Sequence, residues 1–327
     1  MSNNKEVGTF YCCWSKWEWP VDKIPAKDLT RIYLAFLDVD VDGTVKAAKK
    51  YEYIFDVAKE LIRKAKAKNP DLKLMFSIGG SPEIFSSVAA DSNMREKFAE
   101  TAKNVVELYK FDGVDIDWEY PADKTDGHNF VFLLEACRRA LGNGKDLSFS
   151  SPTGSQNYYN LDFPGMNKYL DFYNFMGYDL AGHWNDKSTH SSNLHQHDCN
   201  QLSIDGALKD YLDSSVPANK IILGMPLYGV VFEGTDGLCE PYESIRADQP
   251  FYADLLKGPT SELDQEAGAS YTFDKRTFIS WDTPEEIKLK AAYVNSRGLA
   301  GGFFWQCGGD AKDKDSAVAA FKQGLQK

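Results

Sequence analysis

Four acidic side chains lie within eight positions of the segment FDGVDIDWEY, residues 111–120, among residues that otherwise read as core. Successive side chains of a β-strand point to opposite faces. If this segment is a strand, Asp115, Asp117 and Glu119 share one face, and the Val, Ile and Trp between them share the other. The apolar face would pack against helices. The three carboxylates are therefore expected to point into the interior of a sheet or barrel.

Three carboxylates on one face cannot all ionise at low cost, because nearby like charges raise at least one pKa. A proton shared by the group is expected, and the titration then belongs to the group as a whole. A carboxylic acid that stays protonated near neutral pH can serve as a general acid. A solvated acidic edge and a divalent-metal site are the alternatives. The interleaved apolar residues disfavour the edge, and a metal would need further oxygen ligands.

Eight strand-like apolar runs alternate with helical patterns along the chain. The runs are residues 7–13, 31–37, 73–79, 113–119, 147–153, 171–178, 221–229 and 301–307. Amphipathic helices are predicted within YEYIFDVAKELIRKAKA, NMREKFAETAKNVVELYK, GHNFVFLLEACRRALG and PEEIKLKAAYVNSRG. This alternation predicts a parallel sheet, and eight repeats favour a closed (β/α)8 barrel. The rival open, doubly wound sheet usually carries a Gly-rich phosphate loop, which this sequence lacks.

The barrel is expected to be one domain over residues 1–327. Residues 230–270, before the last strand, are polar and contain glycine, and we expect a long loop or a reduced insertion there. Glu119 ends its strand at the C-terminal mouth of the barrel, where sites of this fold lie.

Composition limits the possible partners. The formal net charge is -11, which disfavours nucleic acid as a partner. No apolar run is long enough to predict a membrane span. The N-terminus lacks the apolar stretch of a signal peptide, so we expect an extracellular protein if a leader was removed and a cytoplasmic one otherwise. We expect a monomer that uses no cofactor.

Six cysteines are too few for a disulfide scaffold in a chain of 327 residues. Cys12, Cys13 and Cys307 lie in strand-like runs and are predicted to be buried thiols. Cys199 and Cys239 lie in loop-like segments and could pair. One loop also gathers histidines near Cys199, namely His183, His190, His195 and His197. Zinc sites usually show tighter ligand pairs, so a polar loop over the cleft is favoured over a metal site.

The acidic segment resembles the DGxDxDxE signature of glycoside hydrolase family 18, the chitinases. MFSIGG (75–80), FMGYDLAGHW (175–184), ILGMPLYG (222–229) and GLAGGFFW (298–305) resemble other strand motifs of that family. The likeness extends over about residues 6 to 325. It implies hydrolysis of β-1,4-linked N-acetylglucosamine by a substrate-assisted, retaining mechanism, in which the acetamido group of the sugar is the nucleophile.

The resemblance also implies roles for individual residues. Glu119 would be the general acid and base, Asp117 would bind Glu119 and the acetamide N–H, and Asp115 would share a proton with Asp117. Tyr178 would orient the acetamide carbonyl. Ser77 would support Asp115, Asp179 would contact the sugar, and Trp305 would form the floor beneath it. Other candidate substrate contacts are Gly80 of the SxGG-like motif, Phe36, Met176, Tyr228 and Trp184, with Trp14, Trp17 and Trp19 as possible extensions of a stacking platform.

Two positions depart from the family pattern. Phe10 stands where many members have tyrosine, so one hydrogen bond of the acid network is missing or supplied differently. Val230 stands where many have arginine. An endo-β-N-acetylglucosaminidase acting on N-glycans is an alternative activity. A chitin-binding lectin is a third, disfavoured because such lectins typically lose the final glutamate of the signature.

Overall fold

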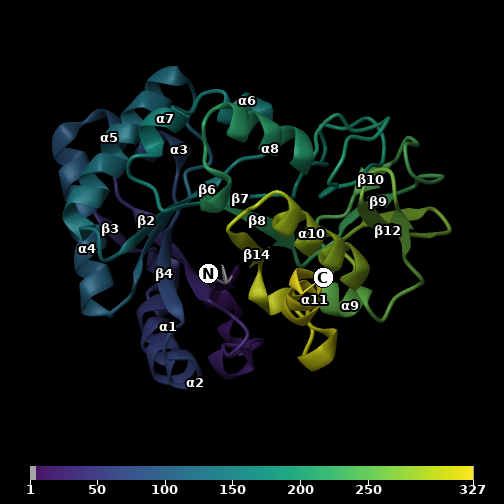
Figure 1. Cartoon of the computed structure of the whole chain (residues 1–327), viewed down its shortest axis with the longest axis horizontal. Helices are drawn as coiled ribbons and strands as arrows, with labels where there is room; N and C mark the ends of the chain where they lie inside the picture. Colours follow the sequence, from purple (N-terminus) through teal and green to yellow (C-terminus); the bar gives the residue numbers. More distant parts are fainter. Residues whose placement is uncertain (1–4, 327) are drawn as a thin grey trace.

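Eight parallel strands close into a barrel in the computed structural model, which describes residues 5–326 (Figure 1). The strands are β1 (Glu6–Cys12), β2 (Arg31–Val39), β4 (Lys73–Ile78), β5 (Gly113–Ile116), β6 (Asp146–Ser151), β7 (Phe172–Phe175), β8 (Ile221–Pro226) and β14 (Gly301–Trp305). They follow the order β1-β14-β8-β7-β6-β5-β4-β2, and β1 pairs with β2 to close the ring. The predicted (β/α)8 barrel is confirmed.

The strands are continuous apolar runs because both of their faces are covered. Outward residues such as Tyr11, Leu34 and Val114 pack with the helices in one large cluster. Inward residues of the same strands, including Phe10, Tyr33 and Phe303, form a second cluster inside the barrel. A short strand, β3 (Val45–Ala47), pairs antiparallel with the end of β2.

Helices fill the connections between barrel strands and cover the outside of the ring (Figure 1). They are α1 (Ile54–Glu60), α2 (Lys66–Lys68), α3 (Pro82–Ala90), α4 (Ser92–Leu108), α5 (Lys124–Leu141), α6 (Ser155–Tyr158), α7 (Phe163–Met166), α8 (Ile204–Asp213), α10 (Pro284–Ser296) and α11 (Ala317–Leu325). The four amphipathic segments predicted from sequence lie in α1–α2, α4, α5 and α10. Side-chain caps define several starts: Asp91 accepts from two backbone N–H groups of α4, and Asp123 does the same for α5.

An antiparallel sheet follows β8 and forms a lobe beside the barrel, at the right of Figure 1. Its strands are β9 (Val230–Glu233), β10 (Ser244–Ile245), β11 (Glu262–Asp264), β12 (Ala269–Asp274) and β13 (Thr277–Ser280), in the order β10-β9-β13-β12-β11. A short helix, α9 (Tyr252–Leu255), lies between β10 and β11. The segment expected to be a loop or reduced insertion over 230–270 is thus a sheet that continues to Ser280.

Cys199 and Cys239 form a disulfide, which the sequence left open. The bond joins the loop before α8 to the connection between β9 and β10. Cys12, Cys13 and Cys307 are buried free thiols, as predicted. Within residues 5–326, no helix is long and apolar enough to cross a membrane.

Candidate active site

The strand β5 is shorter than the acidic segment, whose last residues lie beyond the sheet. Strand β5 stops at Ile116, so Asp117 and Glu119 lie beyond it at the mouth of the barrel. Asp115 is the last acidic residue inside the strand and is fully buried. The residues between the acids, including Val114 and Trp118, are buried in the outer cluster against the helices. The alternation of the sequence therefore produces a row of carboxylates that runs from the barrel interior to its surface.

Asp115 is held by four donors from three other barrel strands, β4, β6 and β7. Its Oδ2 accepts from Ser77 Oγ at 2.8 Å and Ser150 Oγ at 2.9 Å. Its Oδ1 accepts from Ser148 Oγ at 2.8 Å and Asn174 Nδ2 at 2.9 Å. Burial raises the pKa of Asp115 to about 6, although the four donors favour the charged form. Near neutral pH this carboxylate is therefore a fixed anion at the base of the row.

Phe10 cannot donate a side-chain hydrogen bond, and a tyrosine on the next strand, Tyr33, is connected to Asp115 instead. The Tyr33 hydroxyl donates to Asn174 Oδ1 at 2.8 Å, and the amide of Asn174 donates in turn to Asp115. Phe10 itself stacks on Tyr33, with ring centroids 4.7 Å apart. The Tyr33 hydroxyl is thus connected to Asp115 through Asn174, while Phe10 contributes no hydrogen bond.

Asp117 and Glu119 continue the row toward solvent. Burial, with the charges of Glu119 and Asp115, raises the pKa of Asp117 well above its usual value. Its Oδ1 is buried and has no hydrogen-bond partner among the described residues. Glu119 is exposed at the mouth, yet the surrounding protein atoms and the charge of Asp179 raise its pKa. The carboxyl groups of Asp117 and Glu119 titrate together. Because they are close, the favoured state is the one in which the pair holds a single proton.

Tyr178 and Asp179 follow the end of β7. Asp179 adopts a φ of +54°, in the left-handed region that non-glycine residues enter seldom. The Tyr228 hydroxyl donates to Asp179 Oδ1 at 2.5 Å. Tyr178 is buried, and burial together with the charge of Asp117 raises its pKa well above the usual value. Its hydroxyl therefore keeps its proton and can act as a hydrogen-bond donor.

These side chains surround a cavity of about 700 Å³ at the C-terminal mouth of the barrel. Eight of the predicted site residues line it: Asp117, Glu119, Tyr178, Asp179, Trp305, Met176, Phe36 and Trp184. Asp115 and Ser77 lie beneath it, and Tyr228 reaches it through Asp179. The peptide bonds Ala35–Phe36, Glu119–Tyr120 and Trp305–Gln306 are cis, each beside one of the lining residues.

The sequence profile of the family described as Glycosyl hydrolases family 18 matches residues 9–310. The chain belongs to this family. Chitinase 1 of Aphanocladium album is 34% identical over 94% of this chain and 81% of its own. Endochitinase 1 of Metarhizium robertsii is also 34% identical, over 91% of this chain and 79% of its own.

The chain is also similar to a solved structure whose named activity is not that of a chitinase. The family 18 N-acetylglucosaminidase from Paenibacillus barengoltzii superposes with a TM-score of 0.88 and 28% identity, covering 98% of this chain and 100% of that one. Together with the curated relatives it assigns this chain to the glycoside hydrolases.

The aromatic side chains of this family 18 enzyme extend beyond the cavity. Trp305 stacks on Phe36, with centroids 5.7 Å apart, and Phe36 lies 6.2 Å from Trp14. From Trp14 the rings continue to Tyr51 at 5.4 Å and Tyr53 at 6.0 Å from Tyr51. Trp17, which is 66% exposed, ends the series at 4.9 Å from Tyr53. We call these six residues the aromatic row.

The aromatic row borders a second, smaller cavity of about 290 Å³ that shares Phe36, Asp117 and Glu119 with the first. Gly80 lies there, at a φ of +151° that side chains rarely adopt. Trp19, expected as part of a stacking platform, is instead buried, and it lies away from the acids, lining another cavity. Val230 begins the insertion sheet and is buried in its core, so it cannot replace an arginine that contacts substrate.

Several residues around the site were not predicted. Asn174, Ser148, Ser150 and Tyr33 form the buried network, and Tyr120, Gln156, Asn157, Thr153, Leu180 and Leu202 line the cavity. The sequence does contain a pattern that points to the buried network around Asp115. Serine at alternate positions of β6 and asparagine within β7 are polar residues on otherwise apolar strands. The loop residues had no such signal.

Another cavity, of about 800 Å³, lies beside α9, α10 and the last turns of the chain. Lys257, Lys288, Lys312 and Lys314 line it together with several aspartates. It lacks the row of mutually perturbed carboxyl groups, because Asp115, Asp117 and Glu119 do not line it. The cavity over Glu119 is therefore the candidate active site.

Proposed function

We propose that the protein is a chitinase that hydrolyses β-1,4 linkages between N-acetylglucosamine units with retention of configuration. One observation carries the proposal. The row of carboxylates ends at Glu119, at the surface of a cavity that also holds Tyr178 and Trp305. The curated relatives that bear the name chitinase support the same substrate class.

Glu119 acts first as general acid. Its raised pKa favours the protonated carboxyl, which transfers its proton to the glycosidic oxygen as the bond to C1 breaks. The acetamido carbonyl oxygen of the same sugar attacks C1 and forms an oxazolinium ion. Glu119, now ionised, removes a proton from the water that opens this ring at C1. Two displacements at C1 leave the configuration retained.

Asp117 stabilises the positive charge that develops on the acetamide. The single proton that Asp117 and Glu119 share moves onto Glu119 and from there to the glycosidic oxygen, so both carboxyl groups are then ionised and Asp117 can accept from the acetamide N–H. The anchored anion of Asp115, held by its four donors, favours a neutral Asp117 at the start of the cycle. The proton that moves during the reaction is therefore shared by Asp117 and Glu119, and Asp115 acts on them through its negative charge.

Three further groups position the sugar. The Tyr178 hydroxyl donates to the acetamide carbonyl and aligns it with C1, an orientation effect. Asp179, fixed by Tyr228, accepts from the sugar at the cleavage site. The Trp305 indole stacks beneath the apolar face of that sugar. The aromatic row would extend this surface to additional units of a chain.

Product analysis tests the proposal. Wild type and Glu119→Gln are incubated with the N-acetylglucosamine hexamer, and products and anomers are followed by chromatography, NMR and mass. We expect β-anomeric products from wild type and a loss of at least ~10³-fold in kcat for the variant, with hexamer binding retained, because one essential proton donor is removed. α-anomeric products, or an active Glu119→Gln enzyme, would contradict the mechanism.

Three alternatives are distinguished by the hexamer together with an N-glycopeptide. The 28% identical N-acetylglucosaminidase structure favours testing single-sugar release, which the hexamer products report directly. An endo-β-N-acetylglucosaminidase would spare the hexamer and cleave the core of an N-glycopeptide. A lectin would bind the hexamer without cleaving either substrate.

A further inference from the structure

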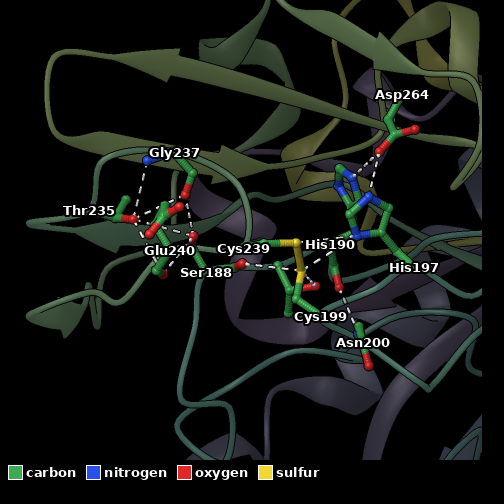
Figure 2. Close-up of a disulfide and its surroundings, with 11 residues drawn as sticks. Ser188, His190, His197, Cys199, Asn200, Thr235, Gly237, Cys239, Glu240 and Asp264 are labelled. Carbon is green, nitrogen blue, oxygen red and sulfur yellow. Dashed lines mark hydrogen bonds and ion pairs between the residues drawn. A yellow bond between two sulfur atoms is a disulfide. The ribbon is translucent and has the colours of Figure 1, made fainter.

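A histidine touches both sulfurs of the Cys199–Cys239 disulfide (Figure 2). His197 Nδ1 lies 3.5 Å from Cys199 Sγ and 3.4 Å from Cys239 Sγ. The two sulfurs and one imidazole nitrogen all lie within 4.8 Å of one another. Disulfide sulfurs carry no hydrogen, so neither can donate to this nitrogen. The imidazole therefore faces two weak acceptors and no donor.

The other side of the ring determines which nitrogen carries hydrogen. His197 Nε2 lies 3.4 Å from Asp264 Oδ2, and His190 Nε2 approaches the same oxygen at 3.2 Å (Figure 2). A carboxylate accepts hydrogen bonds, so it favours the His197 tautomer with hydrogen on Nε2. The Nδ1 lone pair is then directed at the two sulfurs. Two sulfurs and a nitrogen lone pair that converge in this way are suited to a thiophilic cation.

We propose that Cys199, Cys239 and His197 form a Zn²⁺ site when the disulfide is reduced, with Asp264 orienting the imidazole. Tetrahedral zinc with Zn–S bonds of about 2.3 Å and a Zn–N bond of about 2.0 Å places neighbouring ligand atoms about 3.6 Å apart. Both nitrogen-to-sulfur distances already have this value within 0.2 Å. Two thiolates and an imidazole select zinc over magnesium or calcium. A carboxylate behind a ligating histidine is the usual supporting group.

The chemistry balances with a dithiol as reductant. The dithiol supplies two electrons and two protons, the bond between the two sulfurs breaks, and the reductant leaves as its own disulfide. Cys199 and Cys239 are then thiols. One Zn²⁺ displaces one proton from each thiol and forms two Zn–S bonds and one Zn–N bond to His197, so two protons are released.

Hydrogen bonds independent of the disulfide hold the ligands in place. Cys239 N donates to Ser188 O at 2.9 Å, and Ser188 N donates to Glu240 O at 2.9 Å. Around Cys199, the backbone N–H groups of His197 and Asn200 donate to each other's carbonyl oxygens, at 3.1 and 2.9 Å. The two segments should thus stay adjacent after reduction, and only the two sulfurs need to move apart to bind the ion.

The proposed zinc site can be reached from solvent, and a zinc ion bound there would connect the same two segments as the disulfide. The His197 side chain is 16% exposed, so water can occupy a fourth coordination position. Asn200 Nδ2 donates to Leu180 O at 3.2 Å, which connects this loop to the residue after Asp179 in the cavity wall. A bound zinc ion would therefore keep the loop attached to the insertion sheet under reducing conditions.

Cobalt provides the direct test, because tetrahedral Co²⁺ bound by thiolates absorbs visible and near-ultraviolet light. The full chain is reduced with dithiothreitol, the reductant is removed without oxygen, and Co²⁺ is titrated in; Zn²⁺ is then added to displace it. We expect one equivalent of tetrahedral Co²⁺ in the reduced protein and none in the oxidised protein. Equal binding by both forms, or no binding by the reduced form, would overturn the proposal.

Variants assign the ligands. Cys199→Ser combined with Cys239→Ser should abolish the cobalt bands, and His197→Ala should weaken zinc binding at least ~10-fold. Asp264→Asn should weaken it roughly 10- to 100-fold through the imidazole. His195→Ala is the matched control, since His195 is exposed on the same loop, and it should bind as wild type does. Binding that survives the double substitution would belong to the other thiols and would refute the site.

Thermal unfolding gives a readout that needs no substitution. Zn²⁺ should raise the Tm of the reduced protein and leave that of the oxidised protein unchanged, because only the reduced form binds the ion. A reduced protein that is unfolded and that Zn²⁺ does not refold would contradict the proposal.

Discussion

The Tyr228 hydroxyl donates a hydrogen bond of 2.5 Å to Asp179 Oδ1 and so joins the ends of two adjacent barrel strands at the cavity wall. Burial raises the pKa of Asp179, and this hydrogen bond opposes the rise. The charge of Asp179 in turn raises the pKa of Glu119. Tyr228 thus acts on the proposed general acid through Asp179, without lining the cavity itself.

Tyr228→Phe is expected to lower kcat/KM roughly 10-fold or more, because a hydrogen bond to a charged group contributes about 1.5–3 kcal/mol. Without the donor the pKa of Asp179 rises further, so the ionised form is lost at a higher pH. The acidic limb of the kcat/KM profile should therefore move to higher pH. Rates on chitooligosaccharides between about pH 3 and pH 9 measure both effects.

Tyr271→Phe is the matched control for Tyr228→Phe. The Tyr271 hydroxyl donates to Glu262 Oε2 at 2.7 Å, within the insertion sheet. This variant should keep the wild-type pH profile. An acidic limb that does not move in Tyr228→Phe would show that Asp179 does not titrate in the reaction.

The aromatic row should bind sugar units distant from the cleavage site. Trp14→Ala and Trp17→Ala are each expected to raise KM for the hexamer by roughly 5-fold or more, since a stacked ring contributes about 1 kcal/mol or more. Their effect on the trimer should be small, because a short substrate does not reach these rings. Phe132→Ala, an exposed aromatic residue on α5, is the control. Equal losses on both substrates would mean that the row only supports the fold.

Asp115 should make stability depend on pH. Its folded-state pKa of about 6 exceeds the ordinary value of 3.8, so the folded protein holds this proton more tightly than the unfolded chain does. Its contribution is favourable below about pH 4 and is lost as pH rises to about 6. Asp115→Asn cannot titrate, so the difference in unfolding free energy between wild type and variant should change over this window and be flat above it. A difference that is constant from pH 4 to 6 would contradict the raised pKa.

The barrel could be predicted because each strand is a continuous apolar run between helices, a pattern set by burial on both faces. The acidic row could be predicted for a related reason: charged residues at alternate positions of such a run must point into the barrel. The predicted end of β5 was wrong. The strand was predicted to continue to residue 119, whereas β5 ends at Ile116, and Asp117 and Glu119 beyond it line the cavity.

Contacts between distant segments were not predictable from one sequence. Cys239 is separated from Cys199 by 40 positions, and no local pattern specifies that pair. The insertion sheet has short strands of two to six residues, so any alternation of apolar and polar residues is too brief to distinguish them from a polar loop. The place of Tyr33 in the acid network depends on the closure of the barrel, which brings β2 opposite β7.

The buried ammonium group of Lys290 connects the insertion to the barrel helices, and its removal should lower the free energy of unfolding. Lys290 Nζ lies 2.6 Å from Asp282 Oδ2 and 2.9 Å from Glu286 Oε1, and it donates to Ser192 Oγ at 2.6 Å. Lys290→Met would leave two acidic groups buried without a cation, which costs about 3–5 kcal/mol. Urea unfolding should show a loss of this size, whereas Lys288→Met, a half-buried position on the same helix, should lose less than about 1 kcal/mol. Equal losses for the two variants would mean that the pairs with Asp282 and Glu286 do not determine the stability of this region.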